Sequence, residues 1–365
     1  MRVVDSVRNI PLMKVGGEII KLGVIGYKPL GKSNLELGPI LYSYANNDIE
    51  GSRLRLGLRT TTGFSKKWLL SGYVAYGTRD EQLKYSANIE YIISRKPWTV
   101  FGVKRSYDLE RLGVSADNIG NNSLFAAYSR FGTIRRPYFQ EENLVYFRRE
   151  MGRGFTQTLA LRNRSFEPLF PFAFTPQKHD DDQTIRSTYE TTELISETRF
   201  APDELILQND NVRVSTGAIR KPILTLRYTL GLRNVLDGDF TYHRIALTMK
   251  HSFRMGVLGR TYYTIGAGII PSTVPYPLLY MPLGNESSFY VGNAYNLMNY
   301  FEFVCDRWAT VQFEHNFNGL LFNRLPLLRR LKWRELVTAK ALAGSVSSKN
   351  LAMIPATNAT GQALD

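Results

Sequence analysis

The sequence predicts an all-β fold: a transmembrane antiparallel up-and-down β-barrel, which we expect to be incomplete in this chain. The clearest observation is the segment 83–93, LKYSANIEYII, where apolar residues recur at every second position between polar ones. Side chains on a strand point alternately to its two faces, so this strand has one apolar and one polar face. The pattern recurs in segments of about ten residues, the length of a tilted strand crossing a bilayer. Short connections between these segments indicate a meander.

The bulk composition fits such a barrel. The chain has 365 residues, 44% of them hydrophobic, and a mean hydropathy of −0.22. Half of a barrel's strand residues face a polar lumen, which keeps the mean hydropathy low. The longest charge-free run, 261–285, contains four prolines and cannot be a membrane helix. The 21 tyrosines and 4 tryptophans suit the boundary between bilayer and water.

Roughly 13 or 14 strands are expected from alternation and turn signals. They are predicted at residues 53–60, 68–77, 83–94, 98–107, 122–132, 142–150, 154–165, 190–200, 223–235, 244–254, 261–269, 299–305, 307–317 and 334–345. The clearest hairpin spans 222–254 and turns at Asp237-Gly238, because glycine accepts a positive φ.

The chain divides into three expected parts. Residues 1–30 are an N-terminal linker or short helix, 31–345 carry the outer-membrane barrel strands, and 346–365 are a polar tail. The first residues lack the apolar core of a signal peptide, and a barrel ordinarily finishes on a strand. We therefore expect a fragment that lacks its signal peptide and its closing strands.

The formal charge of +14 comes from 46 basic and 32 acidic residues. One interpretation is an arginine-rich lumen; another is a surface for anionic lipid or lipopolysaccharide headgroups. The expected partners are outer-membrane lipid and lipopolysaccharide, with other outer-membrane or periplasmic proteins as a further class. Basic residues are spread over many strands without a nucleic-acid motif, so no nucleic acid is expected. The lumen-facing basic residues are expected to be Arg53, Arg55, Arg59, Arg244, Lys250 and Arg254.

No catalytic or metal-binding constellation is predicted, and no cofactor is expected. The four histidines lie in separate segments, and neither HExxH nor CxxC spacing occurs. The acidic cluster 179–182, HDDD, offers carboxylates to a divalent cation, but a solvated loop tip is the favoured interpretation. Cys305 is the only cysteine, so it cannot form an intrachain disulfide and is expected to pack as a small hydrophobe.

The best candidate for a functional element is the long loop at 270–298. It is apolar, rich in proline and almost uncharged, so it should fold into the lumen or pack under the barrel wall. It would act there as a plug that gates a pore, or simply fill a wide barrel. The loop residues expected in the lumen are Pro275, Tyr276, Pro277, Gly284, Asn285, Glu286, Gly292 and Asn293.

Several phrases together resemble one family. They are EGSRLRLGLRT (50–60), SGYVAYGTRDEQLKY (71–85), PYPLLYMPLGNES (275–287), AYNLMNYFEF (294–303) and EHNFNGLLFNRLPLLRRLKWRE (314–335). The chain resembles, from about residue 30 to 350, the outer-membrane β-barrels of unknown function that usually follow a carboxypeptidase-regulatory-like domain. The resemblance implies an outer-membrane barrel with that domain and a signal peptide upstream.

That family is in turn similar to the barrels of outer-membrane assembly factors, surface antigens and two-partner secretion translocators. Their long lumen loop carries an Arg-Gly-aromatic tip. The comparable place here, 282–295, has no arginine, so the resemblance does not carry insertase or secretion activity to this chain. An Arg-Gly-Phe does occur in MGRGF (151–155), but at the start of an expected strand, where coincidence is favoured.

The function expected from the sequence is a non-catalytic scaffold in the outer membrane of a Gram-negative cell, acting in transport, assembly or surface anchoring. One alternative is a passive porin-like channel. The other is a soluble β-sandwich binding protein, because a sandwich shows the same alternation with its apolar face turned to a core.

Overall fold

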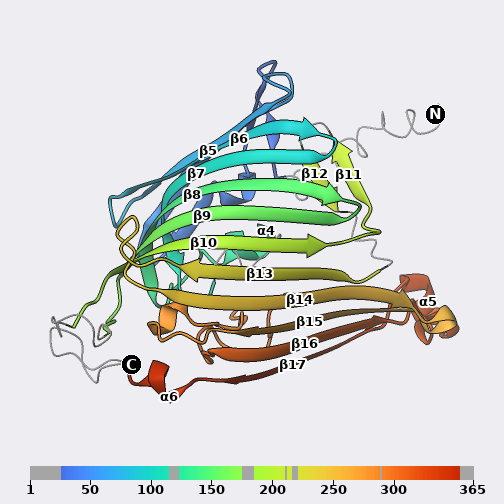
Figure 1. The fold of residues 1–365 in the computed structure, drawn as a ribbon. Helices are drawn as coiled ribbons and strands as arrows, with labels where there is room; N and C mark the ends of the chain where they lie inside the picture. Colours follow the sequence, from blue (N-terminus) through green and yellow to red (C-terminus); the bar gives the residue numbers. More distant parts are fainter. Residues whose placement is uncertain are drawn as a thin grey trace.

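The alternating segments form one curved antiparallel sheet of 15 strands (Figure 1). The computed structural model describes residues 26–114, 123–174, 185–209, 212–215, 221–287 and 290–353. The expected N-terminal linker therefore lies almost wholly outside the described residues, as does most of the expected polar tail.

From β4 onward, successive long strands pair with each other, as the short connections predict. These strands are β4 (Gly51–Thr60), β5 (Trp68–Gly77), β6 (Leu83–Arg95), β7 (Trp98–Arg111), β8 (Pro137–Gly152), β9 (Phe155–Pro168), β10 (Tyr189–Phe200), β13 (Ile223–Gly231), β14 (Tyr242–Arg254), β15 (Arg260–Ile269), β16 (Arg307–Asn316) and β17 (Leu336–Ser345). The all-β, antiparallel up-and-down fold class is confirmed.

Short elements complete the fold. At one edge, β2 (Leu35–Leu37) and β3 (Tyr44–Asn47) both pair with β4, and β1 (Lys28–Pro29) pairs with β2. A separate hairpin consists of β11 (Ile206–Asn209) and β12 (Val212–Ser215). The helices are α4 (Ser123–Tyr128), α5 (Pro326–Leu331) and α6 (Ser348–Leu351), with single 3-10 turns η1 (Ile40–Tyr42), η2 (Gly256–Leu258), η3 (Tyr276–Leu278) and η4 (Phe322–Arg324). Within the described part of the chain, β17 pairs only with β16, so the sheet is not closed.

Two predicted strands are wrong. The segment 122–132 contains helix α4, because its Ser-Leu-Phe-Ala-Ala run favours a helix where no neighbouring strand competes. The segment 299–305 is not a strand, because Phe301 has a φ of +65°, which breaks an extended backbone. None of the helices among the described residues has the length and apolar character to cross a bilayer.

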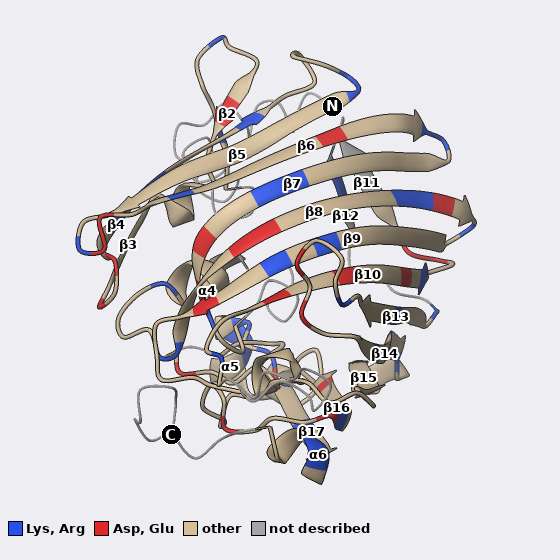
Figure 2. Ribbon diagram, turned by 60° about the vertical axis from the view of Figure 1, so that its left-hand side comes forward, with Lys and Arg blue, Asp and Glu red and all other residues tan. Residues whose placement is uncertain are grey.

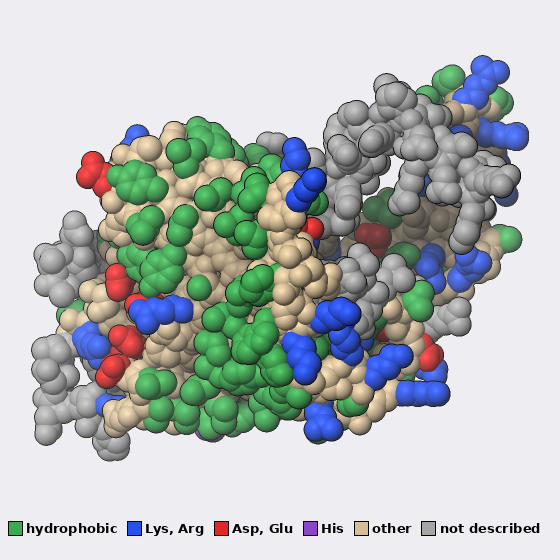
Figure 3. Space-filling model, turned by 90° about the horizontal axis from the view of Figure 1, so that it is seen from above, with side chains coloured by type: hydrophobic (Ala, Val, Ile, Leu, Met, Phe, Trp, Pro, Cys, Tyr) green, Lys and Arg blue, Asp and Glu red, His purple; other side chains and the backbone are tan. Residues whose placement is uncertain are grey.

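The apolar face of the sheet is exposed. On β6, the exposed fractions are 61% for Leu83, 46% for Ile89 and 49% for Ile93. Leucines of β4 and aliphatic residues of β14 and β16 are exposed in the same way. Figure 3 shows hydrophobic side chains gathered over a broad part of one side of the molecule. A soluble sandwich would bury this face against a second sheet.

The opposite face buries charge. Glu50, Arg53, Lys84, Asp108 and Arg130 form an acid–base cluster in which Arg53 is 1% exposed and Lys84 is fully buried. The Arg53 guanidinium donates to Glu50 at 2.6 Å and to both Asp108 oxygens at 2.8 and 3.0 Å. The Lys84 ammonium lies 3.0 Å from Glu50. Because buried charges must be paired, this cluster holds β4, β6 and β7 together from the inside.

The two ends of the sheet differ in their connections. At one end, short turns at 96–97, 153–154 and 255–259 join the strands, with longer connections at 201–222 and 317–335. We call this the short-turn end. At the other, the long-loop end, the three connections 112–136, 169–188 and 270–306 are long, and 78–82 and 232–241 are shorter. In Figure 1 the short-turn end is at the right and the long-loop end at the left.

We predict that Arg53→Met lowers the free energy of unfolding by about 3–5 kcal/mol, because it leaves two buried carboxylates without their main partner. Urea unfolding of the detergent-folded protein measures the change. The control is Arg59→Met, since Arg59 pairs with Glu36 at a partly exposed position and should cost less than about 1 kcal/mol. Equal costs would contradict the acid–base cluster as a buried support.

Candidate functional site

The connection between β15 and β16, residues 270–306, folds against the inner face of the sheet. We call it the lumen loop. Ile270, Val274, Leu278, Leu279 and Met281 are all buried, together with Trp308 of β16 and aromatic residues of the 169–188 connection. The loop therefore contributes an apolar core on the inner face of the sheet.

The eight loop residues predicted from the sequence fall into two groups. Pro275, Tyr276 and Pro277 form the first turn of the loop, where the Tyr276 ring meets Phe172 edge-on at 5.3 Å. The others lie near the tip of the loop. They are Gly284, Asn285, Glu286, Gly292 and Asn293.

Main-chain and amide contacts hold the tip of the loop in one shape. Gly284 bridges Tyr295, and a Cβ at Gly284 would lie 2.3 Å from the carbonyl oxygen of Asn299. Asn296 accepts a hydrogen bond from the Asn285 side chain at 2.7 Å and another from the Val291 amide at 2.8 Å. The tip is therefore preorganised around an asparagine pair and a position that only glycine fits.

Lys340 of β17 clamps this tip to the wall. Its ammonium group donates to the carbonyl oxygens of Ala294, Gly292 and Val291 at 2.6, 2.8 and 3.2 Å. The same ammonium lies 4.8 Å from the ring centroid of Tyr290. Since an ammonium group has three donors, these three carbonyls use its full capacity.

A second contact with the wall lies at the base of the loop. The Tyr280 ring stacks on Trp308 of β16 at a centroid distance of 4.3 Å. Burial raises the pKa of Tyr280 to about 12. Tyr280 also forms a bridge with the buried Cys305, whose packing as a small hydrophobe is what the sequence predicts.

The lumen loop also packs on the 112–136 connection. Val114 and Phe125 join Leu283, Val291 and Tyr300 in a buried cluster. Around it, the Arg111 guanidinium lies 5.2 Å from the Tyr300 ring, and that of Arg136 lies 5.1 Å from the Phe301 ring. The two longest connections of the long-loop end thus pack together as one unit.

Residues 345–353 fasten the end of the loop. Asp306 accepts hydrogen bonds from the Ser347 amide at 2.8 Å and from the Asn350 side chain at 2.9 Å. Burial raises the pKa of the Asp306 carboxyl, but these hydrogen bonds outweigh it and lower the pKa below its ordinary value. Asn350 in turn accepts from the Val274 amide at 2.9 Å. The start of the expected tail therefore serves as a strap on the lumen loop.

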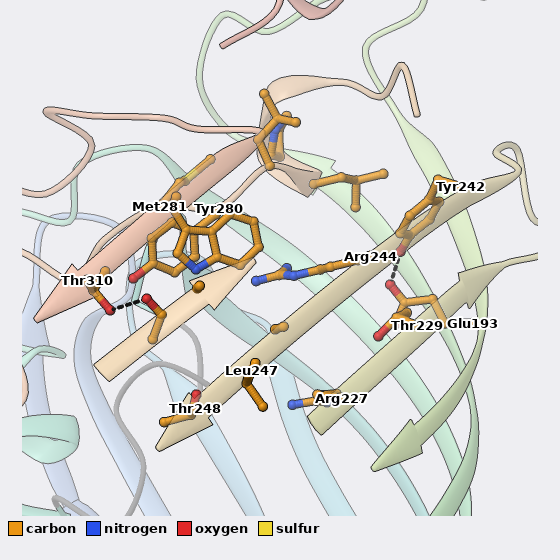
Figure 4. A pocket seen from close by; sticks show the side chains of 18 of the residues that line it. Glu193, Arg227, Thr229, Tyr242, Arg244, Leu247, Thr248, Tyr280, Met281 and Thr310 are labelled. Carbon is orange, nitrogen blue, oxygen red and sulfur yellow. Dashed lines mark hydrogen bonds between the residues drawn. The ribbon is translucent and has the colours of Figure 1, made fainter. Parts of the chain in front are cut away.

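A cavity of about 370 Å³ lies between the lumen loop and the inner wall (Figure 4). Its wall carries four arginines, two glutamates and several threonine hydroxyls, and residues 277–281 of the loop cover it. Glu193 pairs with Arg162 at 2.6 Å and with Arg164 at 2.7 Å, and it accepts from the Tyr242 hydroxyl. Arg244 points toward Trp308, with 5.5 Å between its guanidinium carbon and the ring centroid.

A second cavity of about 600 Å³ continues along the inner wall toward β5–β8. The two cavities share lining residues, which are Tyr138, Arg162, Arg164, Glu197 and Arg227. A polar space therefore runs along the inner face of the sheet beneath the lumen loop.

The six predicted lumen-facing basic residues lie in different environments. Arg53 belongs to the acid–base cluster, and Arg55 stacks on the Tyr73 ring at 3.6 Å. Arg59 pairs with Glu36 at 2.6 Å, and Arg244 lines the cavity under the lumen loop. Lys250 and Arg254 are exposed on β14. The structure brings only Arg53 and Arg55 near each other, through Asp108 and Tyr73.

Sequence reasoning missed Lys340, Trp308 and Asp306. A signal for Lys340 exists, because it is the lone cation among small apolar residues in TAKALAG (338–344). The described residues contain no group of three metal-ligating side chains, and the 179–182 cluster lies outside them. The MGRGF motif forms the turn from β8 to β9, far along the strands from the lumen loop.

Residues 24–350 match the model of the C-terminal domain of a family of unknown function, DUF5686. A search of curated proteins finds no match. The chain is similar to a crystal structure of BamA from Haemophilus ducreyi lacking POTRA domains 1–3, with a TM-score of 0.48 and 8% sequence identity. The similarity covers 82% of this chain and 57% of that one, so the chain spans little more than half of its length.

We predict that Lys340→Met loosens the tip of the lumen loop, because three carbonyls lose their charged donor. Loss of these hydrogen bonds should destabilise the tip by about 1–2 kcal/mol. The rate of amide hydrogen exchange at residues 290–295 should therefore rise roughly 10-fold. Mass spectrometry of deuterated peptides measures it. Lys250→Met, on the exposed part of β14, is the matched control and should leave the exchange of this segment unchanged. An unchanged loop in Lys340→Met would contradict the clamp.

Proposed function

The chain belongs to the DUF5686 C-terminal domain family, whose function is unknown, and we propose that it is an outer-membrane β-barrel scaffold with a plugged lumen. It acts without covalent catalysis in transport, assembly or surface anchoring. The observation that carries this proposal is the inverted polarity of the sheet, which exposes leucines and isoleucines and buries arginine, lysine and carboxylates. Lipid is the solvent in which such a sheet is stable.

The asymmetry of the connections supports an orientation. Outer-membrane barrels place short turns on the periplasmic side and long loops on the extracellular side. The lumen loop would then enter from outside the cell. Its contacts with Trp308, Lys340 and the 112–136 connection would keep the lumen closed in the resting state.

We predict that Ile89→Arg costs about 2–4 kcal/mol when Ile89 faces the bilayer. Glu90→Arg, one residue along on the inner face, should cost less, because that face already accepts charge. Urea unfolding gives the two values. Gel mobility with and without boiling, after membrane fractionation of the full parent protein, reports the folded barrel. Equal costs for the two variants, or soluble protein without a heat-dependent shift, would contradict the proposal.

A passive porin-like channel is the second candidate, favoured by the two adjoining charged cavities of about 370 and 600 Å³. It predicts stepwise conductance in planar bilayers that rises when residues 275–293 are deleted, because the deletion removes the cover of the polar space. The Lys340→Met variant should raise the open probability less than the deletion does. No conductance in any of these proteins would count against a channel and favour the plugged scaffold.

A further inference from the structure

The connection between β16 and β17, residues 317–335, forms a compact projection at the short-turn end (Figure 1). We call it the basic knob. Asn318 and Gly319 turn the chain with φ of +54° and +83°, and Pro326 starts the short helix α5. At the base of the knob, the Phe317 amide donates to the carbonyl oxygen of Glu335 at 3.0 Å. The projection is therefore a folded turn and not an extended tail.

The charge of the basic knob is one-sided. It carries five cations and a single acid, Glu335. The Glu335 carboxylate accepts hydrogen bonds from the main-chain amides of Leu321 and Phe322, so main-chain donors occupy it. The five cations are all exposed, and within the described part of the chain no carboxylate lies at ion-pair distance from them. They are Arg324, Arg329, Arg330, Lys332 and Arg334.

The same projection exposes large apolar side chains. The exposed fractions are 52% for Leu325, 74% for Leu327, 51% for Leu331 and 56% for Trp333. Leucines between cations, with a tryptophan beside them, are typical of segments that lie in the boundary between headgroups and acyl chains. Val337, at the start of β17, continues this exposed apolar surface onto the strand.

Neighbouring turns add to the positive charge of this end. Lys66, Lys67, Lys96, Arg149 and Arg153 are exposed in or beside the turns that follow β4, β6 and β8. The long-loop end carries many of the carboxylates instead. Figure 2 shows Lys and Arg at the arrowhead ends of β6 and β8, with acidic segments near both arrowheads as well, and further Asp and Glu toward the opposite end of β8.

We propose that the short-turn end docks on anionic phospholipid headgroups of the leaflet that it meets, and that the basic knob is the part that enters the headgroup layer. The cations match the phosphates, and Leu327, Leu331 and Trp333 match the apolar layer beneath them. This inference rests on the proposed function, because only an embedded sheet brings its turns to the headgroups. It adds the class of lipid and the segment that recognises it.

The test compares three forms of the full chain, folded in detergent. They are the wild type, the knob variant R324Q/R329Q/R330Q, and the control variant R79Q/R135Q/R307Q, which removes three exposed arginines from the long-loop end. Each protein is mixed with equal amounts of phosphatidylglycerol and phosphatidylcholine. Native mass spectrometry then counts the lipids of each kind that remain bound. A parallel sample adds poly-glutamate as an acidic polymer without an acyl chain.

We expect the wild type and the control variant to retain phosphatidylglycerol over phosphatidylcholine. The knob variant should lose this preference by about 10-fold or more, because three cations near the surface are removed. Equal lipid retention by all three proteins, an equal loss in both variants, or displacement of the lipid by poly-glutamate overturns the inference. The proposed function stands in those cases as long as the heat-dependent gel shift persists, and it fails separately if the shift is absent.

Discussion

Burial of charge on the inner face of the sheet determines which side chains lie on its outer face. Side chains alternate along a strand, so turning Arg53 and Lys84 inward places Leu54 and Leu83 on the outside. One strand cannot exchange its inner and outer faces without breaking its ion pairs with the neighbouring strands. The polarity of β6 is therefore tied to that of β4 and β7 through Glu50 and Asp108. A largely apolar outer surface follows for these three strands, interrupted by the exposed ion pair of Arg105 and Glu141.

The lumen loop depends on the same wall from the inside. Trp308 and Lys340 belong to β16 and β17, so the loop is held by the last two strands of the sheet. Its other side rests on the 112–136 connection and on the strap that Asp306 holds. Any movement of the loop away from the lumen has to break aromatic stacking, a lysine clamp and a buried cluster together.

Alternation predicts most of the sheet because it reports which face of a strand meets which solvent. Strand β5 is predicted at its observed bounds, Trp68–Gly77, and the turns between β6 and β9 fall where glycine, proline and charge interrupt the pattern. It fails at 122–132 and 299–305, where short apolar runs pack inside the lumen against another loop. Periodicity cannot distinguish these two segments from strands, because the spacing of their apolar residues is set by tertiary contacts. Composition identifies the lumen loop. Its contact with Lys340 could not be predicted from composition, because that contact depends on the register of β17 in the sheet. The resemblance to a family of unknown function is confirmed.

The lipid and water accessibility of β6, measured residue by residue, shows directly which face of the sheet meets the bilayer. A nitroxide is placed in turn at positions 85–90 in a Cys305→Ser background, and the protein is reconstituted in vesicles. We predict that labels at Tyr85, Ala87 and Ile89 collide with oxygen dissolved in lipid. Labels at Ser86, Asn88 and Glu90 should not, because they face the interior. If a water-soluble nickel reagent reached a label at Ile89 as readily as a label in a loop, the outer face of β6 would not be in contact with lipid.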